Sequence, residues 1–390
     1  MPRLASGGPD AIVRAQFPDR ARTRAARGGG DLINVSSSSV TVISVDAMGG
    51  DHGPIVTIAG VEAFLKRHGA RRARFVLHGD EAAIEAQLAK APLARAASEV
   101  RHTDLVIAMD EKPAVAVRRG KGSSLWNAIQ SVKSGEADAI VSAGNTGALM
   151  ALSKLILRMS APGLDRPAIV ASWPTIKGGH TAVLDVGANV SSDAKQLVEF
   201  AIMGEAFHRA VHHIDKPTIG ILNVGSEEMK GHDEVREAAL LLRSGRFDLN
   251  YKGFVEGDDL SRGVVDVVVT DGFTGNIALK TAEGVARFIS TLMKDALLSS
   301  PLSRVGAMLA YGALKAMRSR IDPNSINGGP LLGLNGLVIK SHGGADARGF
   351  NSALRVAIDL AESDYMAKVA ENMARLDVDE AVSDIEEAAQ

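Results

Sequence analysis

One pattern recurs five times along this chain: a short run rich in β-branched residues ends in a glycine-bearing turn, and an amphipathic stretch follows. It occurs at residues 42–51, 139–157, 181–204, 218–231 and 264–284. Strands that are buried on both faces read as continuous apolar runs, and their alternation with helices is typical of a parallel sheet covered on both sides. The pattern predicts an α/β fold, a three-layer α/β/α sandwich with a mostly parallel sheet, in a single domain over residues 42–375.

The five turns carry small polar side chains in addition to glycine. In open parallel sheets ligands bind beyond the carboxyl ends of the strands, so we expect the turns to converge on one edge of the sheet. A glycine in such a turn can equally serve only to permit a positive φ angle or the close packing of a helix. Polar residues at strand ends are, however, the usual lining of a polar ligand site. The residues concerned are Asp46, Asp51, Asn145, Thr146, Asp185, Asn189, Asn223, Glu227, Asp271, Thr274 and Asn276.

Composition excludes several classes of function. The formal net charge of -2 lacks the basic excess of a nucleic-acid-binding protein, so no nucleic-acid partner is expected. The absence of cysteine removes disulfides, thiolate zinc sites and cysteine nucleophiles, and it suits a reducing compartment. No apolar run approaches the roughly 18 to 20 residues of a membrane span, and no signal peptide opens the chain. We expect a cytoplasmic protein.

Known motifs narrow the chemistry further. The sequence has no G-x-x-x-x-G-K-[ST], no strand-linked G-x-G-x-x-G with a later acidic partner and no G-x-S-x-G, so no nucleotide cofactor or serine nucleophile is indicated. The histidines lack metal-ligand spacing, and no metal is expected. Anion binding remains, because residues 144–147 and 272–275 place a threonine and backbone N–H groups where a helix begins. The same threonines would equally serve as plain N-caps.

Seven motifs in order give the chain a family resemblance. In these motifs the sequence resembles the bacterial phosphate acyltransferases, which transfer a fatty acyl group from acyl carrier protein to inorganic phosphate. The resemblance implies a fold similar to isocitrate dehydrogenases and phosphotransacetylases, a homodimer, and an acyl phosphate product for phospholipid synthesis, with a glycerol-3-phosphate acyltransferase as a further partner. The motifs are VDAMGGDHGP (45–54), SAGNTGALM (142–150), LDVGANV (184–190), NVGSEEMKG (223–231), TDGFTGNIALKTAEG (270–284), GGPLLGLNG (328–336) and SHGGAD (341–346).

The resemblance and the chemistry together favour Lys230 and Asn276 as catalytic residues. Phosphate near neutral pH is largely a dianion, judging by the second pKa of about 6 for phosphate monoesters, so it needs positioning more than deprotonation. The attacked thioester carbonyl develops negative charge on oxygen, which calls for preorganised donors such as a lysine or an amide. The alternative roles are a surface partner of Glu227 or Glu228 for Lys230 and local bonding near the helix start for Asn276.

The remaining candidates are assigned to phosphate and substrate binding or to docking. The aspartates have supporting roles only, because a bare carboxylate repels a phosphate dianion. The basic turn at Arg118, Arg119 and Lys121 is interpreted as a docking surface for the acidic carrier protein, with phosphate binding and a plain solvated loop as alternatives. The predicted binding set is Asp46, Gly49, Gly50, Asp51, Gly144, Asn145, Thr146, Gly147, Asp185, Asn189, Asn223, Gly225, Glu227, Asp271, Thr274, Gly275 and His342.

The ends of the chain and one helical stretch differ from the rest. Residues 1–41 are rich in arginine, glycine and serine and predict a disordered arm, and residues 376–390 form an acidic tail. The stretch 284–322 predicts a helical hairpin with its turn at residues 299–301, whose apolar faces suit a dimer bundle. An exposed apolar tip beside basic residues predicts peripheral attachment to the inner face of the cell membrane. The tip residues are Leu297, Leu298 and Leu302.

Three other functions fit parts of the pattern. A phosphate acetyl- or butyryltransferase that uses coenzyme A would share the sheet, the loops and the phosphate chemistry. A decarboxylating dehydrogenase of the related fold would need nicotinamide and a divalent metal. A phosphate-sensing scaffold would bind phosphate without consuming a thioester. The preferred thioester donor, nicotinamide absorbance and thioester release distinguish these functions.

Overall fold

The computed structural model describes residues 40–69, 72–161, 164–321, 327–363, 365–367 and 369. The predicted arm, up to residue 39, and the predicted acidic tail lie outside these residues. The first strand begins at Thr41, one residue earlier than the sequence pattern predicts.

An 11-stranded sheet forms the centre of the protein. Neighbouring strands pair in parallel except at β11–β10, β10–β5 and β5–β6. The sheet is therefore mostly parallel, as the sequence predicts. Its strands in spatial order are β3 (Ser98–His102), β2 (Ala73–Gly79), β1 (Thr41–Asp46), β4 (Ala139–Ser142), β11 (Leu337–Lys340), β10 (Gly329–Leu332), β5 (Ala168–Pro174), β6 (His180–Leu184), β9 (Val267–Val269), β7 (Thr218–Leu222) and β8 (Asn250–Val255).

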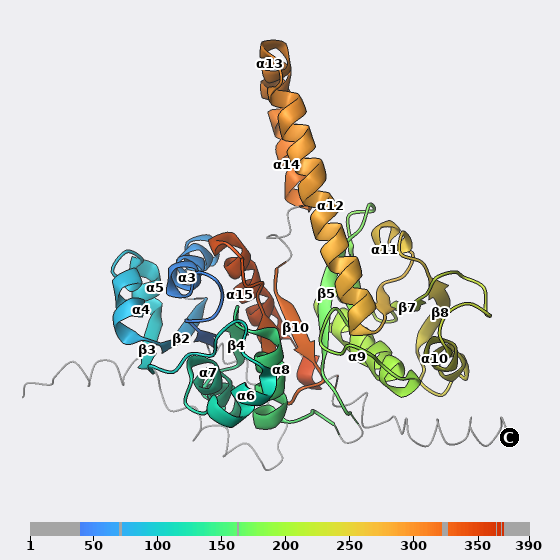
Figure 1. The fold of residues 1–390 in the computed structure, drawn as a ribbon, viewed down its shortest axis with the longest axis horizontal. Coiled ribbons are helices and arrows are strands. Elements are labelled where there is room, and N and C mark those ends of the chain that lie inside the picture. Colours follow the sequence, from blue (N-terminus) through green and yellow to red (C-terminus); the bar gives the residue numbers. More distant parts are fainter. Residues whose placement is uncertain are drawn as a thin grey trace, which may run out of the picture.

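Helices cover both faces of this sheet and complete the predicted three-layer α/β/α sandwich (Figure 1). In the first half, α3 and α15 pack on each other and α15 packs on β4 and β11, while α7 and α8 lie on the opposite face. In the second half, α9 packs on β6 and β9. The helices are α3 (Pro54–His68), α4 (Glu81–Leu88), α5 (Pro92–Ala97), α6 (Pro113–Arg119), α7 (Ser124–Lys133), α8 (Thr146–Leu157), α9 (Ala194–His212), α10 (Asp233–Arg243), α11 (Asp259–Arg262), α12 (Gly272–Leu298), α13 (Pro301–Leu309), α14 (Tyr311–Ile321) and α15 (Ala347–Glu362).

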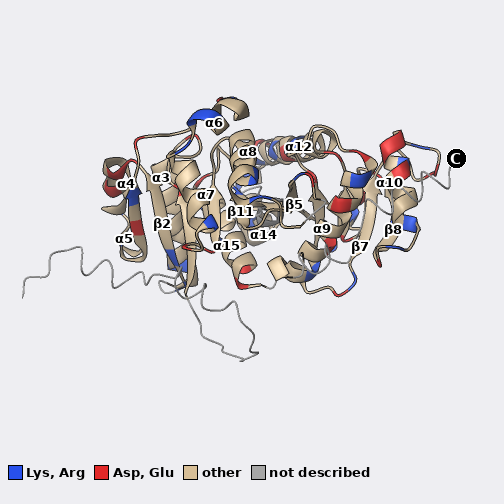
Figure 2. Cartoon of the chain, turned by 90° about the horizontal axis from the view of Figure 1, so that it is seen from below, with Lys and Arg blue, Asp and Glu red and all other residues tan. Residues whose placement is uncertain are grey.

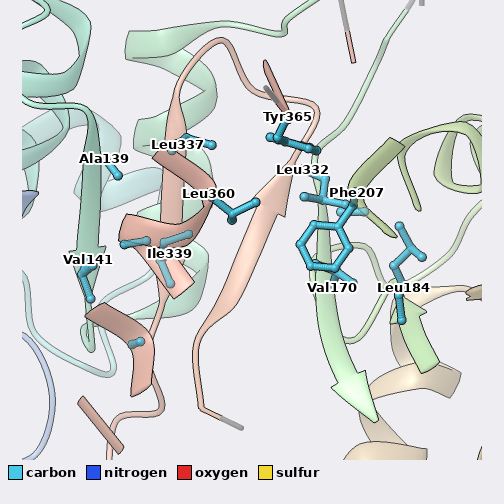
Figure 3. Packing of buried hydrophobic residues seen from close by; sticks show 14 of the residues in the cluster. Ala139, Val141, Val170, Leu184, Phe207, Leu332, Leu337, Ile339, Leu360 and Tyr365 are labelled. Carbon is cyan, nitrogen blue, oxygen red and sulfur yellow. The ribbon is translucent and has the colours of Figure 1, made fainter. Parts of the chain in front are cut away.

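The core explains why the strands read as continuous apolar runs. Successive residues of a strand point to opposite faces, and both faces are buried here. Val141 and Ile339 join the cluster that contains residues of α3, α9 and α15, whereas Ile140 and Val338 join the cluster that contains residues of α7 and α8. Figure 3 shows the first cluster where β11, β10 and β5 meet, with Phe207 of α9 packed beside the strands.

The antiparallel centre changes one sequence-based expectation. The direction of the chain reverses at β11–β10, at β10–β5 and again at β5–β6, so β6, β9 and β7 run opposite to β1, β4 and β11. The five glycine turns therefore do not follow strands of one direction, as a single edge would require. The two halves are staggered, however, because Ile339 pairs with Pro330 and Val170 pairs with Leu184, so the carboxyl ends of β11 and β6 lie at about the same level of the sheet. The turns come from two oppositely directed sets of strands whose ends approach each other near the centre of the sheet.

A projecting arm consists of the outer part of α12 together with α13 and α14 (Figure 1). α12 continues without a break from Gly272 to Leu298, so the arm is the extension of a helix that starts at the sheet and not a separate hairpin from residue 284. The turn predicted at residues 299–301 lies between α12 and α13, and Ser300 caps α13 by accepting from the backbone N–H of Ser303. Within the described ranges, none of the helices combines the length and the apolar character that crossing a lipid bilayer requires.

The buried histidine of β2 makes the stability of the fold depend on pH. Burial and the nearby charge of Arg101 lower the pKa of His78 to about 3, and its Nε2 lies 3.3 Å from Oγ of Ser131. Below the ordinary histidine pKa of about 6.5 the unfolded chain takes up a proton that the folded chain does not. We therefore expect the folded state to lose about 2 kcal/mol between pH 7 and pH 5 through this group, measured by urea unfolding.

The matched variant is His78→Asn, which keeps a polar partner for Ser131. It should be less stable than the wild type at pH 7 but should lose less stability on acidification to pH 5. The exposed His232 serves as the control position, because His232→Gln should leave the pH dependence unchanged. An identical pH dependence in wild type and His78→Asn would contradict the assignment.

Candidate active site

Three loops that follow the neighbouring strands β1, β4 and β11 lie against one another. The backbone N–H of Asp51 donates to the carbonyl of Gly343 at 3.0 Å. A Cβ placed on Gly49 would lie only 2.7 Å from the backbone nitrogen of Gly144, and Gly50 adopts a φ of 91°, so glycine is required at both positions. We call these loops, residues 47–53, 143–147 and 341–346, the first loop group.

Asp46 lies beneath the first loop group with only 3% of its surface exposed. Ser142 Oγ donates to Oδ2 of Asp46 at 2.7 Å and accepts from the backbone N–H of Gly144 at 3.0 Å. Burial raises the pKa of Asp46, while hydrogen bonds from serine hydroxyls and the charge of Lys340 oppose the rise. The carboxyl group ties β1 to the loop after β4. Its buried position agrees with the supporting role that the sequence predicts.

Two lysines that the sequence interpretation did not include lie beside His342 in this group. Lys340, the last residue of β11, donates from Nζ to the carbonyls of Ala143, at 3.4 Å, and Ser341. Lys280 of α12 lies with its Nζ 3.1 Å from Nε2 of His342. Burial lowers the pKa of Lys340 to about 8. Burial, followed by the charge of Lys280, lowers the pKa of His342, and Nδ1 of its ring accepts from the backbone N–H of Gly344 at 3.2 Å.

Asn145 has a structural role in the first loop group. Its Nδ2 contacts three backbone carbonyls within residues 108–111 at distances from 2.8 to 3.2 Å. Its Oδ1 accepts from the backbone N–H of Ala148 at 3.0 Å and so caps α8. A Cβ on Gly147 would lie 2.7 Å from Cγ of Pro113, so this glycine permits close packing of α6 on α8. Asn145 and Gly147 therefore have the structural roles that were the alternatives to ligand binding. The neighbouring Thr146 is half-exposed at the start of α8.

A second loop group forms at the ends of β6 and β9, and the carboxylate of Asp185 organises it. The two oxygens accept from the backbone N–H groups of Ile169 and of residues 187–189 and from the side chain of Asn189, at 2.6 to 3.2 Å. Burial raises the pKa of Asp185, and these hydrogen bonds oppose the rise. Asp185 and Asn189 are both buried and engaged with the chain itself. They shape the loop.

The first turn of α12 packs tightly onto this loop. A Cβ on Gly275 would lie 2.0 Å from the carbonyl oxygen of Asp185, and a Cβ on Gly272 would lie 2.3 Å from that of Asn189. No side chain can be accommodated at such distances without movement of the backbone. The glycines of the GFTG motif therefore serve helix packing, which is the alternative role that a glycine in a strand-end turn can have.

Of the other polar residues in this turn, some cap the helix and one has an exposed side chain. Asp271 is the N-cap of α12, where Oδ1 and Oδ2 accept from the backbone N–H and the hydroxyl of Thr274 at 2.9 and 2.7 Å. Asn276, in contrast, is exposed, and its side chain lies over Gly187, where an added Cβ would be 3.5 Å from Cγ of the asparagine. Among the predicted residues of the second loop group, Asn276 is the one whose amide is free to meet a ligand.

The third loop, residues 223–231, follows β7, the neighbour of β9. Asn223 closes it by donating from Nδ2 to the carbonyl of Lys230 at 3.0 Å. A Cβ on Gly225 would lie 2.7 Å from Oε2 of Glu227 and 3.3 Å from Cγ of Lys230, so these side chains lie over the glycine. Glu228 pairs instead with an arginine of α10 at 2.7 Å. The exposed ammonium of Lys230 makes no hydrogen bond or ion pair with the described residues and remains available.

The predicted basic turn lies apart from these contacts. Arg118 and Arg119 end α6 and, with Lys121, are exposed, and Figure 2 shows the basic residues of α6 gathered at one edge of the protein. Ser123 is buried and caps α7 by accepting from the backbone N–H of Trp126 at 3.2 Å. The hydroxyl in this turn therefore serves the helix, and the three cations face solvent.

α12 connects the first and second loop groups across the molecule. Asn276 faces the second group at Gly187, and Lys280, four residues later and therefore on the same helical face, contacts His342 of the first group. The helix thus brings an amide, an ammonium and the glycine-rich loops to one place. This arrangement can surround an anion and offer donors to a carbonyl oxygen next to it.

Comparison with known proteins supplies the family. Residues 41–368 match the family described as "Fatty acid synthesis protein". The phosphate acyltransferase of Caulobacter vibrioides is 65% identical over 339 residues, which cover 87% of this chain and 93% of that protein. The phosphate acyltransferase of Maricaulis maris is 59% identical over 337 residues, covering 86% of this chain and 95% of that protein. This chain belongs to the phosphate acyltransferase family.

Membership of the phosphate acyltransferase family makes the protein an acyltransferase and confirms the resemblance drawn from the seven motifs. A phosphotransacetylase from Streptococcus pyogenes matches the structure with a TM-score of 0.56 at 18% identity, covering 83% of this chain and 94% of that chain. At this identity the likeness concerns the fold alone. It confirms the phosphotransacetylase-like sandwich expected from the sequence.

The contact between α12 and the second loop group predicts a large effect of a single methyl group. Gly275→Ala should lower the free energy of unfolding by about 3 kcal/mol, because the new Cβ overlaps the carbonyl oxygen of Asp185. Gly284, farther along the same helix, has open space around an added Cβ. Gly284→Ala should raise stability by about 1 kcal/mol through helix propensity. Denaturant unfolding of both variants checks this difference, and equal stabilities would contradict it.

Proposed function

We propose that this protein transfers a fatty acyl group from acyl carrier protein to inorganic phosphate and so produces acyl phosphate for phospholipid synthesis. The membership of the phosphate acyltransferase family supports this proposal. The observation that carries it is the placement of Asn276 and Lys280 one turn apart on α12, each facing a different loop group. Such a site offers separate donors for a nucleophilic anion and for the carbonyl that it attacks.

The reaction needs little proton chemistry. An oxygen of the hydrogen phosphate dianion attacks the thioester carbon, a new C–O bond forms, and the C–S bond breaks. The proton of the phosphate ends on the thiolate that leaves, so acyl phosphate and free thiol are the products. What the enzyme must supply is the orientation of phosphate and donors for the carbonyl oxygen, where negative charge develops.

Asn276 and Lys230 are the proposed donors. The amide of Asn276 is exposed beside Gly187, and the ammonium of Lys230 is available on the loop that follows the neighbour strand of β9. Loss of one preorganised donor typically costs about a hundredfold or more in rate. Of the other residues predicted to bind, those that are buried or engaged in caps hold the loops in place. Thr146, Asp51 and His342 remain accessible.

A direct assay tests the function. Purified protein, acyl carrier protein thioester and inorganic phosphate should give phosphate-dependent release of thiol and formation of acyl phosphate. Asn276→Ala and Lys230→Ala should each reduce the rate by about a hundredfold while folding normally. Thioester release in the absence of phosphate, or full activity in both variants, would contradict the proposal.

The same assay separates the alternative donor. A phosphate acetyl- or butyryltransferase would release coenzyme A from short acyl thioesters in preference to the carrier protein thioester. We propose the carrier protein, because the exposed cations Arg118, Arg119 and Lys121 offer an acidic partner a complementary surface. Transfer from the carrier protein should accordingly weaken with added salt, whereas transfer from a small thioester should weaken less.

The projecting arm suggests how the protein meets a second copy and a membrane. Along α12, an exposed stripe at Val285, Phe288, Ile289 and Leu292 recurs at helical spacing, and we propose that a second copy covers it in a homodimer. At the tip, Leu298 and Leu302 are 47% and 82% exposed, whereas Leu297 is half-buried. We propose that the tip inserts shallowly into the cytoplasmic face of the cell membrane. There a glycerol-3-phosphate acyltransferase would receive the product.

The membrane proposal predicts the behaviour of a double variant. Leu298→Glu with Leu302→Glu should lower co-sedimentation with anionic vesicles at least tenfold, because each buried leucine contributes about 1.5 to 3 kcal/mol. Leu155→Glu with Leu240→Glu is the matched control, since both leucines are about half exposed but lie on α8 and α10, away from the arm. Equal losses in the two double variants would show that the tip has no special role.

A further inference from the structure

Two ammonium groups meet at the first loop group, and the predicted site set contains neither. Lys280 reaches the loops from α12, and Lys340 reaches them from the end of β11. His342, two residues after Lys340 in the chain, contacts Lys280. The charge of Lys280 acts on both Lys340 and His342, so the two cations lie within electrostatic range of each other. Like charges repel, and an arrangement that brings them together is stabilised by an anion.

The hydrogen bonds leave donors for that anion. An ammonium group has three N–H donors. Among the described residues, Lys340 uses two of them toward the carbonyls of Ala143 and Ser341, and Lys280 uses one toward Glu283, at 3.0 Å. Nε2 of His342 lies 3.1 Å from Nζ of Lys280, while Nδ1 of the same ring accepts from the backbone N–H of Gly344. Each lysine therefore keeps at least one donor without an acceptor in the described part of the chain.

The surrounding loops are suited to close approach by a small ligand. Gly343 and Gly344 follow His342, and added Cβ atoms there would lie 3.6 and 3.2 Å from the carboxylate of Asp51. Gly50 adopts a positive φ and packs against Gly343. Backbones without side chains expose their N–H groups, which is how glycine-rich turns accommodate phosphate. Of the acidic groups nearby, Asp46 is buried beneath the loops and Glu283 is paired with Lys280. The exposed carboxylate of Asp51 lies within the electrostatic range of Lys340.

The geometry points to Lys280 and Lys340 as the residues that together bind inorganic phosphate, holding it on the first loop group and presenting it toward Asn276. This inference rests on the proposed function and deepens it by locating the phosphate. Side chains four residues apart on a helix have Cβ atoms about 5 to 6 Å apart. A phosphate held at Lys280 is therefore within reach of a thioester carbonyl held at Asn276, one turn earlier on α12.

A purely structural role for the lysines would have different consequences. In that case the two ammonium groups would only neutralise Asp46, Asp51 and Glu283, and their removal would lower stability without changing the affinity for phosphate. The two roles differ in what the Michaelis constants report. Loss of a phosphate ligand raises KM for phosphate and leaves KM for the thioester unchanged.

The test measures both Michaelis constants in Lys280→Met and Lys340→Met. Each variant should raise KM for inorganic phosphate at least tenfold, because a hydrogen bond to a charged group is lost, and should keep KM for the carrier protein thioester within about twofold. Lys66→Met is the matched control, since Lys66 is also a helical lysine paired with a glutamate, at 3.2 Å, but lies on α3 away from the loops. It should leave both constants unchanged.

Calorimetric titration with inorganic phosphate alone separates failure of this inference from failure of the proposed function. Phosphate binding that weakens in both lysine variants supports the inference even if the wild type consumes no thioester, an outcome that would overturn only the function. Wild-type KM for phosphate in the variants, with or without a lower melting temperature, overturns the inference. If Lys340→Met does not fold, the exposed Lys280 decides, because its removal leaves the core intact.

Discussion

The carboxylate of Asp185 is the interaction on which the site depends. It receives hydrogen bonds from the start of β5 and from the loop after β6, where the side chain of Asn189 also donates, so it fixes two pieces of chain at once. An unpaired carboxylate in this position would be costly, because it is fully buried. The loop that it shapes is the surface on which α12 begins. The direction of α12, and everything that this helix carries, follows from that contact.

α12 joins the candidate active site and the projecting arm in one continuous helix. Its first turn packs by glycine on the second loop group, its third turn places Lys280 at the first loop group, and its far end forms the projecting arm. Because the helix is continuous over 27 residues, a movement of the arm would also move Asn276 and Lys280. A second copy or a membrane that bound the arm, as proposed, would therefore be coupled mechanically to the site through a single helix.

The sequence predicts the layers of this fold well because they depend on local patterns. Apolar runs such as 139–142 identify strands buried on both faces, and serine and proline at 300–301 identify a helix start. It does not predict the polarity of the two halves, because that depends on how β10 pairs with β11 and β5, and a glycine turn carries no information about the edge it occupies. Helix capping and ligand binding also use the same residue types. In the sequence, Asn145 and Thr274 therefore look like ligand-binding residues, although both take part in hydrogen bonds at helix starts.

Lys280 and Lys340 were not among the residues predicted for the site, but their positions in the sequence carry a signal that could have identified them. Lys340 is the charged residue that ends the apolar run LVIK, and Lys280 recurs on the helical face of Asn276. Carboxylates such as Asp46 and Asp185 lie inside and hold loops, where their negative charge is compensated by N–H and O–H donors. Lys280 and Lys340 keep donors left over, and the proposed binding of phosphate would use those donors.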